Sequence, residues 1–252
     1  MTTLTPEFLT RALAHRGLHD LAAGAPENSL TAFRRAMDQS YGIECDVQLS
    51  ADGEAMVFHD YSLERLTAEV GPVRERTAAQ LGAITLAGGS EAIPTLGEVL
   101  DLVAGQTPLL IEIKDQDGAL GPDTGALEAA CARVLADYGG TVAAMSFNPH
   151  AMIALRKDCP WLALGLVTCD FVKQNEWFAV PIDRRRALRD MRDLARFDAS
   201  FISHDRHNLA SAPVARIKAR GLPVLCWTVR SRSQEREARK VADNITFEGY
   251  LA

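Results

Sequence analysis

Short apolar runs alternate along the chain with segments in which apolar residues recur at helical spacing. The runs have the length of strands, and the segments between them have the period of amphipathic helices. Strands joined through helices pair in parallel with right-handed crossovers, and eight such units suit a closed barrel. The pattern predicts an α/β fold, a TIM-type (β/α)8 barrel, with the whole chain, residues 1–252, as a single domain. The expected strands are residues 12–17, 43–49, 109–114, 142–147, 162–167, 200–203, 224–229 and 245–247, and the main expected helices are 28–39, 96–103, 126–136, 151–157, 184–197, 213–219 and 234–241.

An additional strand is expected at residues 55–59, directly after the second barrel strand. The Asp52-Gly53 pair between them is a hairpin turn signal, and the connection is too short for a helix. If Asp52 and Gly53 are the two central turn residues, Asp46 lies opposite His59 on the same face of the hairpin. The hairpin is therefore expected to return His59 to the carboxylates of the second strand.

The periodic pattern lapses between residues 60 and 94, where Gly71-Pro72 and Gly88-Gly89 interrupt the chain. This segment leaves from the end of the strand pair that carries the charged residues. Long insertions at that end of a barrel tend to shape the substrate pocket, so we expect a small insertion beside the site. The alternative is a surface excursion without a function, since loops tolerate insertion well.

Charged residues interrupt two of the apolar strands at even spacing: Glu44 and Asp46 in the second, Glu112 and Lys114 in the third. Because side chains alternate along a strand, each pair shares one face, opposite its apolar neighbours. Buried charges are costly unless they pair or bind a metal. Three carboxylates offer an all-oxygen set that suits one divalent cation, Mg²⁺ or Ca²⁺. The alternative is a salt-bridge cluster with Lys114, which is itself either a phosphate contact or a counter-ion.

Composition excludes several classes of partner. The net charge of −6 and a pI near 5.6 argue against nucleic acid, whose binding relies on clustered Lys and Arg. The five cysteines are scattered without a Cys-x-x-Cys pair, which indicates reduced thiols in a cytoplasmic protein. Neither a signal peptide nor an apolar stretch of membrane-spanning length is evident, so no integral membrane segment is expected. A small-molecule substrate is compatible with this net charge, and nothing in the sequence indicates an oligomeric state.

The end of the first strand carries a second group of candidate residues, His15-Arg16-Gly17. Arg16 is suited to bidentate binding of a phosphate, and Gly17 would let the backbone approach a ligand closely. Two histidines beside a phosphodiester, His15 and His59, could act as general base and general acid. The His204-Asp-Arg-His207 spacing occurs in metal sites, but its place after a strand favours a loop or rim feature. Trp227 is either an apolar wall for the substrate or a core aromatic.

Together these motifs resemble the glycerophosphodiester phosphodiesterase family over nearly the whole chain. The resemblance implies a TIM-type barrel that hydrolyses a small-molecule glycerophosphodiester to glycerol 3-phosphate and an alcohol. It also implies a metal at Glu44, Asp46 and Glu112, catalytic roles for His15 and His59, and phosphate contacts from Arg16 and Lys114. The segments that carry it are His15-Arg16-Gly17, Pro26-Glu27-Asn28-Ser29, Glu44-x-Asp46, Asp52-Gly53, His59-Asp60, Ile93-Pro94-Thr95-Leu96, Ile111-Glu112-Ile113-Lys114, Ser146-Phe147 and Trp227-Thr228.

Two positions depart from the family's pattern: Ser29 replaces a more usual Thr, and Glu248 stands where a Thr-Asp-x-Pro pattern is common.

Proteins with other functions use similar residues. A lipid phosphodiesterase acting on lysophospholipids would need an apolar rim, for which residues 168–181 are the candidate. A metal-dependent lyase-type barrel and a non-catalytic binding barrel are further alternatives. The nucleophile in a phosphodiesterase is either water or the glycerol 2-hydroxyl, which would give a cyclic phosphate.

Overall fold

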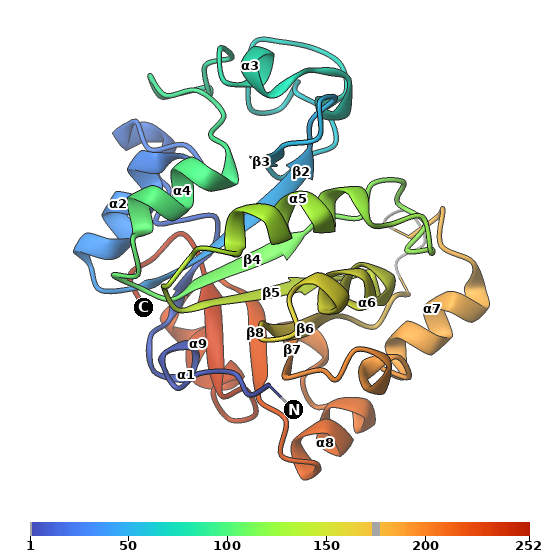
Figure 1. Ribbon diagram of the computed structural model, residues 1–252. Coiled ribbons are helices and arrows are strands. Elements are labelled where there is room, and N and C mark those ends of the chain that lie inside the picture. The colour runs from blue at the N-terminus through green and yellow to red at the C-terminus, as the bar shows by residue number, and fades with distance from the viewer. Residues whose placement is uncertain (1, 173–176) are drawn as a thin grey trace.

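The computed structural model describes residues 2–172 and 177–252 and shows a closed barrel of eight parallel strands (Figure 1). The barrel closes where β1 pairs with both β2 and β9, and β3 adds to β2 as an antiparallel outer strand. This confirms the predicted TIM-type (β/α)8 barrel with a hairpin extension. The strands are β1 (Leu13–Ala14), β2 (Gly42–Leu49), β3 (Ala55–Val57), β4 (Leu109–Ile113), β5 (Val142–Ser146), β6 (Ala163–Thr168), β7 (Phe201–Asp205), β8 (Val224–Val229) and β9 (Asn244–Phe247).

Helices surround the barrel, and Figure 1 shows α5 and α6 side by side on its outer face. Most begin with a side-chain cap; Ser29, for example, accepts a hydrogen bond from the N–H of Ala32 at the start of α2. The α-helices are α1 (Glu7–Thr10), α2 (Leu30–Asp38), α3 (Ala78–Leu81), α4 (Leu96–Val103), α5 (Ala126–Leu135), α6 (Pro149–Asp158), α7 (Ile182–Arg189), α8 (Ala212–Ala219) and α9 (Arg232–Ala238). The 3-10 helices are η1 (Leu21–Ala23), η2 (Val73–Glu75), η3 (Leu194–Arg196) and η4 (Arg206–Asn208).

Side chains alternate between the barrel interior and the layer beneath the helices. Along β2, Ile43, Cys45 and Val47 pack in the layer between strands and helices, whereas Glu44 and Asp46 point the other way into the barrel. The lower interior is filled by apolar side chains, including Phe8 of the short helix α1, which the apolar pattern did not predict. The carboxylates of β2 lie beyond this apolar layer, toward the carboxyl ends of the strands. The interior apolar cluster comprises Leu4, Phe8, Leu13, Leu110, Ala143, Met145, Ala163, Val167, Phe201 and Leu225.

Left-handed residues cut two of the predicted elements short. The first strand stops at Ala14 because Arg16 and Gly17 adopt left-handed backbone conformations, with φ of 55° and 79°. The predicted helix over residues 184–197 is instead α7 followed by η3, with Met191 at φ 57° between them. A left-handed residue cannot continue a strand or a right-handed helix, so the chain turns at these positions.

The hairpin forms, but its predicted register is wrong by one residue. Val47 pairs with Val57 and Leu49 with Ala55, and the N–H of Ser50 donates to the carbonyl of Glu54. The turn therefore has three residues, with Gly53 in the left-handed conformation at φ 85°, rather than two. As a result the carbonyl of Asp46 accepts a hydrogen bond from the N–H of Phe58, and Asp46 does not lie opposite His59.

The insertion that leaves β3, residues 60–94, packs around its own apolar cluster beside the hairpin (Figure 1). It includes η2 and α3, and the carbonyl of Pro94 rejoins the sheet by accepting from the N–H of Val57. The apolar cluster holds the insertion against the end of β2 and β3 that carries the charged residues. Its buried members are Met56, Phe58, Leu63, Leu66, Val73, Leu81, Leu86 and Ile93.

Candidate functional site

Three carboxylates meet inside the barrel at the carboxyl end of neighbouring strands. Glu44 and Asp46 lie on β2 and Glu112 lies on β4, where Asp46 and Glu112 are paired in register. All three side chains are buried, and one oxygen from each lies within 4.8 Å of the others. The even spacing seen in the sequence thus brings the three residues to one point, as their shared face requires.

Lys114 follows β4 and contacts two of these carboxylates. Its Nζ lies 2.7 Å from Asp46 Oδ1 and 2.6 Å from Glu112 Oε1. Burial alone would lower the pKa of Lys114, but the two carboxylates raise it above its ordinary value, so the amine stays protonated. Burial would likewise raise the pKa of Asp46, yet Lys114, His59 and Arg16 hold it well below its usual range.

Glu44 differs from the other two carboxylates because no cation of residues 2–172 and 177–252 pairs closely with its side chain. Burial, reinforced by the charges of Asp46 and Glu112, raises its pKa well above the ordinary value. Its Oε2 accepts from the backbone N–H of Arg16 at 3.0 Å, whereas its buried Oε1 has no hydrogen-bond partner among the described residues. A buried oxygen without a partner, within an all-oxygen donor set, fits a hard divalent cation better than a closed salt-bridge cluster.

The loop after β1 brings Arg16 to the same carboxylates. Its left-handed backbone directs the N–H at Glu44, while its guanidinium Nε lies 3.3 Å from Asp46 Oδ2 and its Nη1 donates to Glu27 Oε1 at 2.6 Å. Gly17 has a different role from the expected ligand contact: a Cβ there would meet the backbone and side chain of Ala32 at 2.9 Å. Glycine is required because α2 packs closely against this loop.

His15 lies beside the carboxylate cluster, and its Nδ1 is hydrogen-bonded to the carboxylate of Glu248, the residue that follows β9. Its Nε2 lies 4.0 Å from Glu44 Oε2. Burial lowers the pKa of His15, and the hydrogen bond to Glu248 only partly opposes this effect. Glu248 also pairs with Arg230 at 2.7 Å. Burial would raise the pKa of Glu248, but the hydrogen bond from His15 and the nearby His19 and Arg230 hold it far below its usual range.

His59 reaches the site from the end of the hairpin. Its Nδ1 lies 2.6 Å from Asp60 Oδ1, so each of the two histidines has a carboxylate behind its Nδ1. Asp60 in turn accepts from Arg65, which belongs to the insertion. A carboxylate at Nδ1 fixes the orientation and tautomer of an imidazole and leaves its Nε2 for chemistry.

The charged residues enclose a cavity of about 210 Å³ at the end of the barrel. Phe147 and Trp227 form an apolar wall, with their rings 5.5 Å apart, and the indole N–H of Trp227 donates to the carbonyl of Ser203. The cavity is lined by His15, Arg16, Glu44, His59, Glu112, Lys114, Met145, Phe147, Trp227, Thr228, Arg230 and Thr246. It combines cations, carboxylates and imidazoles with a nonpolar surface, as an anionic substrate with an apolar part would need.

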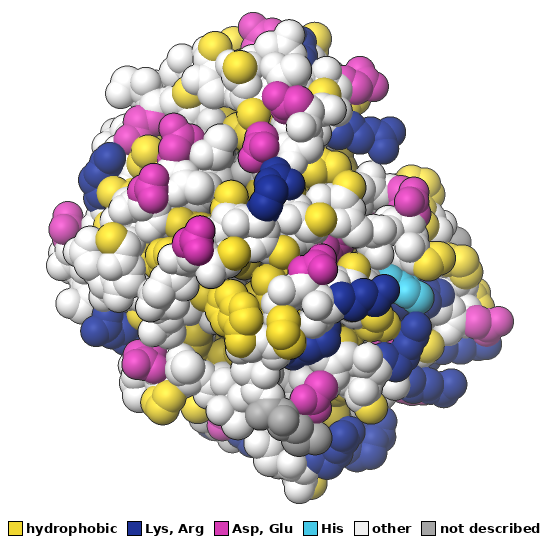
Figure 2. Space-filling view, in the orientation of Figure 1, with side chains coloured by type: hydrophobic (Ala, Val, Ile, Leu, Met, Phe, Trp, Pro, Cys, Tyr) yellow, Lys and Arg dark blue, Asp and Glu magenta, His cyan; other side chains and the backbone are white. Residues whose placement is uncertain are grey.

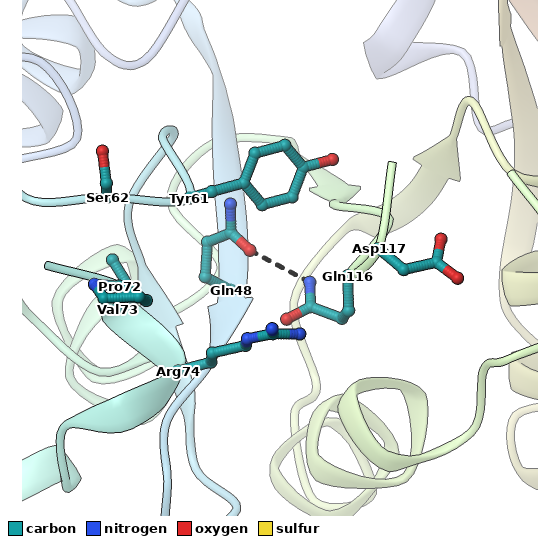
Figure 3. A pocket seen from close by; sticks show the side chains of 8 residues that line it. All are labelled: Gln48, Tyr61, Ser62, Pro72, Val73, Arg74, Gln116 and Asp117. Atoms are coloured by element: carbon teal, nitrogen blue, oxygen red, sulfur yellow. Dashed lines mark hydrogen bonds between the residues drawn. The ribbon is translucent and has the colours of Figure 1, made fainter. Parts of the chain in front are cut away.

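A wider cavity of about 620 Å³ opens beside the first and shares His59, Glu112, Lys114 and Phe147 with it. A third cavity, of about 350 Å³, lies between the insertion and the segment after β4 (Figure 3). Tyr61 borders both the second and the third, and the amides of Gln48 and Gln116 are hydrogen-bonded at 3.0 Å in the third. The insertion therefore contributes lining residues to two cavities next to the charged cluster.

Several contacts of the site were not assigned from the sequence. Asn28 donates its amide to Asp46 Oδ2 at 2.9 Å, and Glu27 pairs with Arg16; both residues stand in a motif whose individual roles the sequence left open. Arg65 and Arg230 carried no local signal, since arginines are common on surfaces and their partners are distant in sequence. His204 and His207 do not join the cluster: the first is buried in β7 and the second is exposed on η4.

Comparisons with known proteins point to one family. A model of the glycerophosphoryl diester phosphodiesterase family matches residues 15–244. A glycerophosphodiester phosphodiesterase from Caldanaerobacter subterraneus is 30% identical over 249 residues, covering 94% of this chain and 93% of that relative.

Solved structures show the same fold. A phosphodiesterase from Oleispira antarctica in complex with the product sn-glycerol-3-phosphate has a TM-score of 0.78 and 25% identity, covering 96% of this chain and 93% of that one. The fold is also shared with a glycerophosphodiester phosphodiesterase from Thermotoga maritima, at a TM-score of 0.69 and 20% identity over 94% of each chain.

Proposed function

The chain belongs to the glycerophosphoryl diester phosphodiesterase family, and from this we propose that its charged cavity hydrolyses a glycerophosphodiester to glycerol 3-phosphate and an alcohol. One observation carries the proposal: a cavity of about 210 Å³ is lined by two carboxylate-held histidines, three cations and two members of the buried three-carboxylate cluster. The Oleispira antarctica relative, which binds sn-glycerol-3-phosphate, supports this choice of product.

Glu44, Asp46 and Glu112 are the residues that would hold a divalent cation, either Mg²⁺ or Ca²⁺. Such a cation would neutralise the phosphodiester and polarise its phosphoryl oxygens. Arg16 and Lys114 add positive charge on either side of Asp46, at 3.3 Å and 2.7 Å from its oxygens. We assign both as phosphate contacts, with Arg16 suited to bidentate binding and Lys114 acting as a point charge.

The two histidines occupy different positions relative to the cavities, and from these positions we assign one as the acid and the other as the base. His15 lines the smaller cavity, whereas His59 lines both the smaller and the wider one. We place the glycerol phosphate half in the smaller cavity against Trp227 and the alcohol half in the wider one. His59 then protonates the leaving alkoxide, and His15 accepts the proton of the nucleophile. That nucleophile is water or the glycerol 2-hydroxyl, and detection of a cyclic phosphate distinguishes the two.

A lysophospholipid phosphodiesterase is a second candidate, favoured by the apolar rim of the wider cavity. Trp177 and Phe178 line this cavity, and Phe178 is 83% exposed. Ile182, also exposed, begins α7, whose sequence Ile-Asp-Arg-Arg-Arg-Ala-Leu-Arg is strongly basic. Figure 2 shows Lys and Arg side chains gathered over α7 and α8, and such a combination suits an anionic lipid surface. Part of the proposed rim, residues 173–176, lies outside the described residues, and no described helix is long and apolar enough to cross a membrane.

The deciding experiment is a substrate and metal matrix. Purified protein is incubated with glycerophosphocholine, glycerophosphoethanolamine or a lysophospholipid, each with Mg²⁺, Ca²⁺ or chelator, and glycerol 3-phosphate and lysophosphatidic acid are measured. The proposal expects metal-dependent release of glycerol 3-phosphate from the water-soluble diesters. Exclusive turnover of the lysophospholipid would favour the second candidate, and release unaffected by exhaustive chelation would contradict the metal site.

A further inference from the structure

Arg65, in the insertion, joins two carboxylates that stand behind different parts of the site. Its Nε and Nη2 donate to Asp60 Oδ2 and Oδ1 at 2.6 and 2.8 Å. Its Nη1 and Nη2 donate to Glu27 Oε2 and Oε1 at 2.8 and 2.9 Å. One guanidinium thus makes a two-point contact with each carboxylate, a geometry that fixes the plane of both partners.

Each of these two carboxylates also contacts a residue that lines the cavity of about 210 Å³. Asp60 Oδ1 lies 2.6 Å from His59 Nδ1, and Glu27 Oε1 accepts from Arg16 Nη1 at 2.6 Å. The result is a continuous row of charge-assisted contacts, in the order His59, Asp60, Arg65, Glu27, Arg16. It runs from the hairpin, through the insertion, to the loop after β1.

The charges along the row alternate and support one another. Burial would raise the pKa of both carboxyls, but the hydrogen bonds from His59 and Arg65 hold the pKa of Asp60 far below its usual range. Hydrogen bonds and charge from Arg65 and Arg16 lower the pKa of Glu27 in the same way. Both carboxylates therefore stay ionised and can accept from their partners at neutral pH.

We propose that Arg65 is a positioning residue, which orients the imidazole of His59 through Asp60 and the guanidinium of Arg16 through Glu27. This inference rests on the roles given above to His59 and Arg16. Arg65 lines none of these three cavities, so it acts on the reaction through its two carboxylate partners. The insertion thereby takes part in ordering the site as well as in lining its cavities.

Lysine cannot replace arginine in this role. A single ammonium lacks the planar fork that contacts both oxygens of two carboxylates at once. Although 47% of the Arg65 side chain is exposed, its four hydrogen bonds set it apart from ordinary surface pairs, which rarely matter. Arg34 provides a matched control, because it also joins the barrel to the insertion through an ion pair with Glu91, at 3.1 Å and with 51% of its side chain exposed, yet it does not reach the site.

The experiment compares Arg65→Ala, Arg65→Lys and Arg34→Ala in the metal-loaded enzyme. With glycerophosphocholine we expect kcat to fall about 10- to 100-fold in both Arg65 variants and to stay near wild type in Arg34→Ala. Millimolar guanidinium chloride, far below denaturing levels, should restore activity to Arg65→Ala and leave Arg65→Lys unchanged. Equal losses in Arg65→Ala and Arg34→Ala, without rescue, would mean that only attachment of the insertion matters and would overturn the proposal.

A substrate with a nitrophenolate leaving group tests the route through His59. Nitrophenolate leaves without a proton, so a glycerol nitrophenyl phosphodiester should lose less activity in Arg65→Ala than glycerophosphocholine does. An equal loss with both substrates would overturn the route through His59.

His59→Ala, measured in parallel, distinguishes a failure of the positioning role of Arg65 from a failure of the role of His59. If His59→Ala is impaired and Arg65→Ala is not, only the positioning role is overturned. If His59→Ala turns over at the wild-type rate, the acid role of His59 fails and the route from Arg65 through Asp60 falls with it. If the wild-type enzyme releases no glycerol 3-phosphate, the proposed function itself fails.

Discussion

The carboxylate of Glu248 holds the Nδ1 of His15, although the two residues are 233 positions apart in the sequence. They meet because the barrel closes between β1 and β9, where Ala14 pairs with Phe247. The hydrogen bond leaves the His15 Nε2 on the side of Glu44. Closure of the barrel thus completes one half of the proposed acid and base pair.

Removing this contact should slow the reaction. In Glu248→Ala we expect kcat to fall about 10- to 100-fold, because His15 loses the partner that sets its tautomer and orientation. Glu248→Gln keeps an acceptor and should be affected less. Steady-state kinetics with glycerophosphocholine measure both, with the exposed Glu237→Ala as control. Wild-type kcat in Glu248→Ala would show that His15 does not need this orientation.

Divalent cations should stabilise the folded protein through the three carboxylates. A ligand at 100 times its Kd adds about 2.7 kcal/mol to the free energy of unfolding, which raises Tm. Thermal melts with and without Mg²⁺ or Ca²⁺ should therefore differ in the wild type. Asp46→Asn and Glu44→Gln should lose most of this shift, whereas Glu98→Gln, at the N-terminal cap of α4, should retain it. An undiminished shift in both site variants would place the cation elsewhere.

The barrel interior should be intolerant of one added methyl group at Gly165. A Cβ at this position would meet the fully buried ring of Phe201 at 2.3 Å. We expect Gly165→Ala to lower the free energy of unfolding by about 1–3 kcal/mol, through overpacking. Gly121→Ala is the control, since a Cβ there meets nothing within 4 Å. Urea unfolding curves measure both, and equal stability of the two variants would refute tight packing here.

Buried His204 should make the fold sensitive to acid. Burial lowers its pKa from 6.5 to about 4, while Thr168 Oγ1 lies 2.7 Å from its Nδ1. Because the folded-state pKa is depressed, the unfolded chain takes up the proton first, so stability falls as pH drops from 6.5 to about 4. The loss amounts to at most about 3.5 kcal/mol, the free energy that corresponds to this change in pKa. His204→Asn should flatten the fall in urea-derived stability between these pH values, and an unchanged slope would contradict the assignment.

Much of the barrel was predictable because the signals are local. Alternation along β2 and β4 places Glu44, Asp46 and Glu112 on the inner face, and apolar periodicity locates most helices. The hairpin register failed for a local reason as well: Gly53 serves a three-residue turn, and Asp-Gly does not by itself distinguish that turn from a two-residue one.

The residues that support the site were less accessible from the sequence. Arg65 and Arg230 come close to the carboxylates they pair with only when the insertion and the last strand have folded against the barrel. The left-handed backbone conformation of Arg16 also has no signal in the sequence, because a positive φ at a residue other than glycine is fixed by its surroundings. Contacts of this kind depend on tertiary structure and leave no periodic pattern.

Turnover of glycerophosphocholine by His15→Ala and His59→Ala, in the presence of the activating cation, tests most directly whether the two histidines are the acid and the base. The exposed His207→Ala, outside the cavity, is the control. We expect each site variant to lose at least ~10²-fold in the rate of the chemical step, measured under single-turnover conditions, while the control keeps wild-type activity. Near-wild-type turnover in both His15→Ala and His59→Ala would contradict these roles.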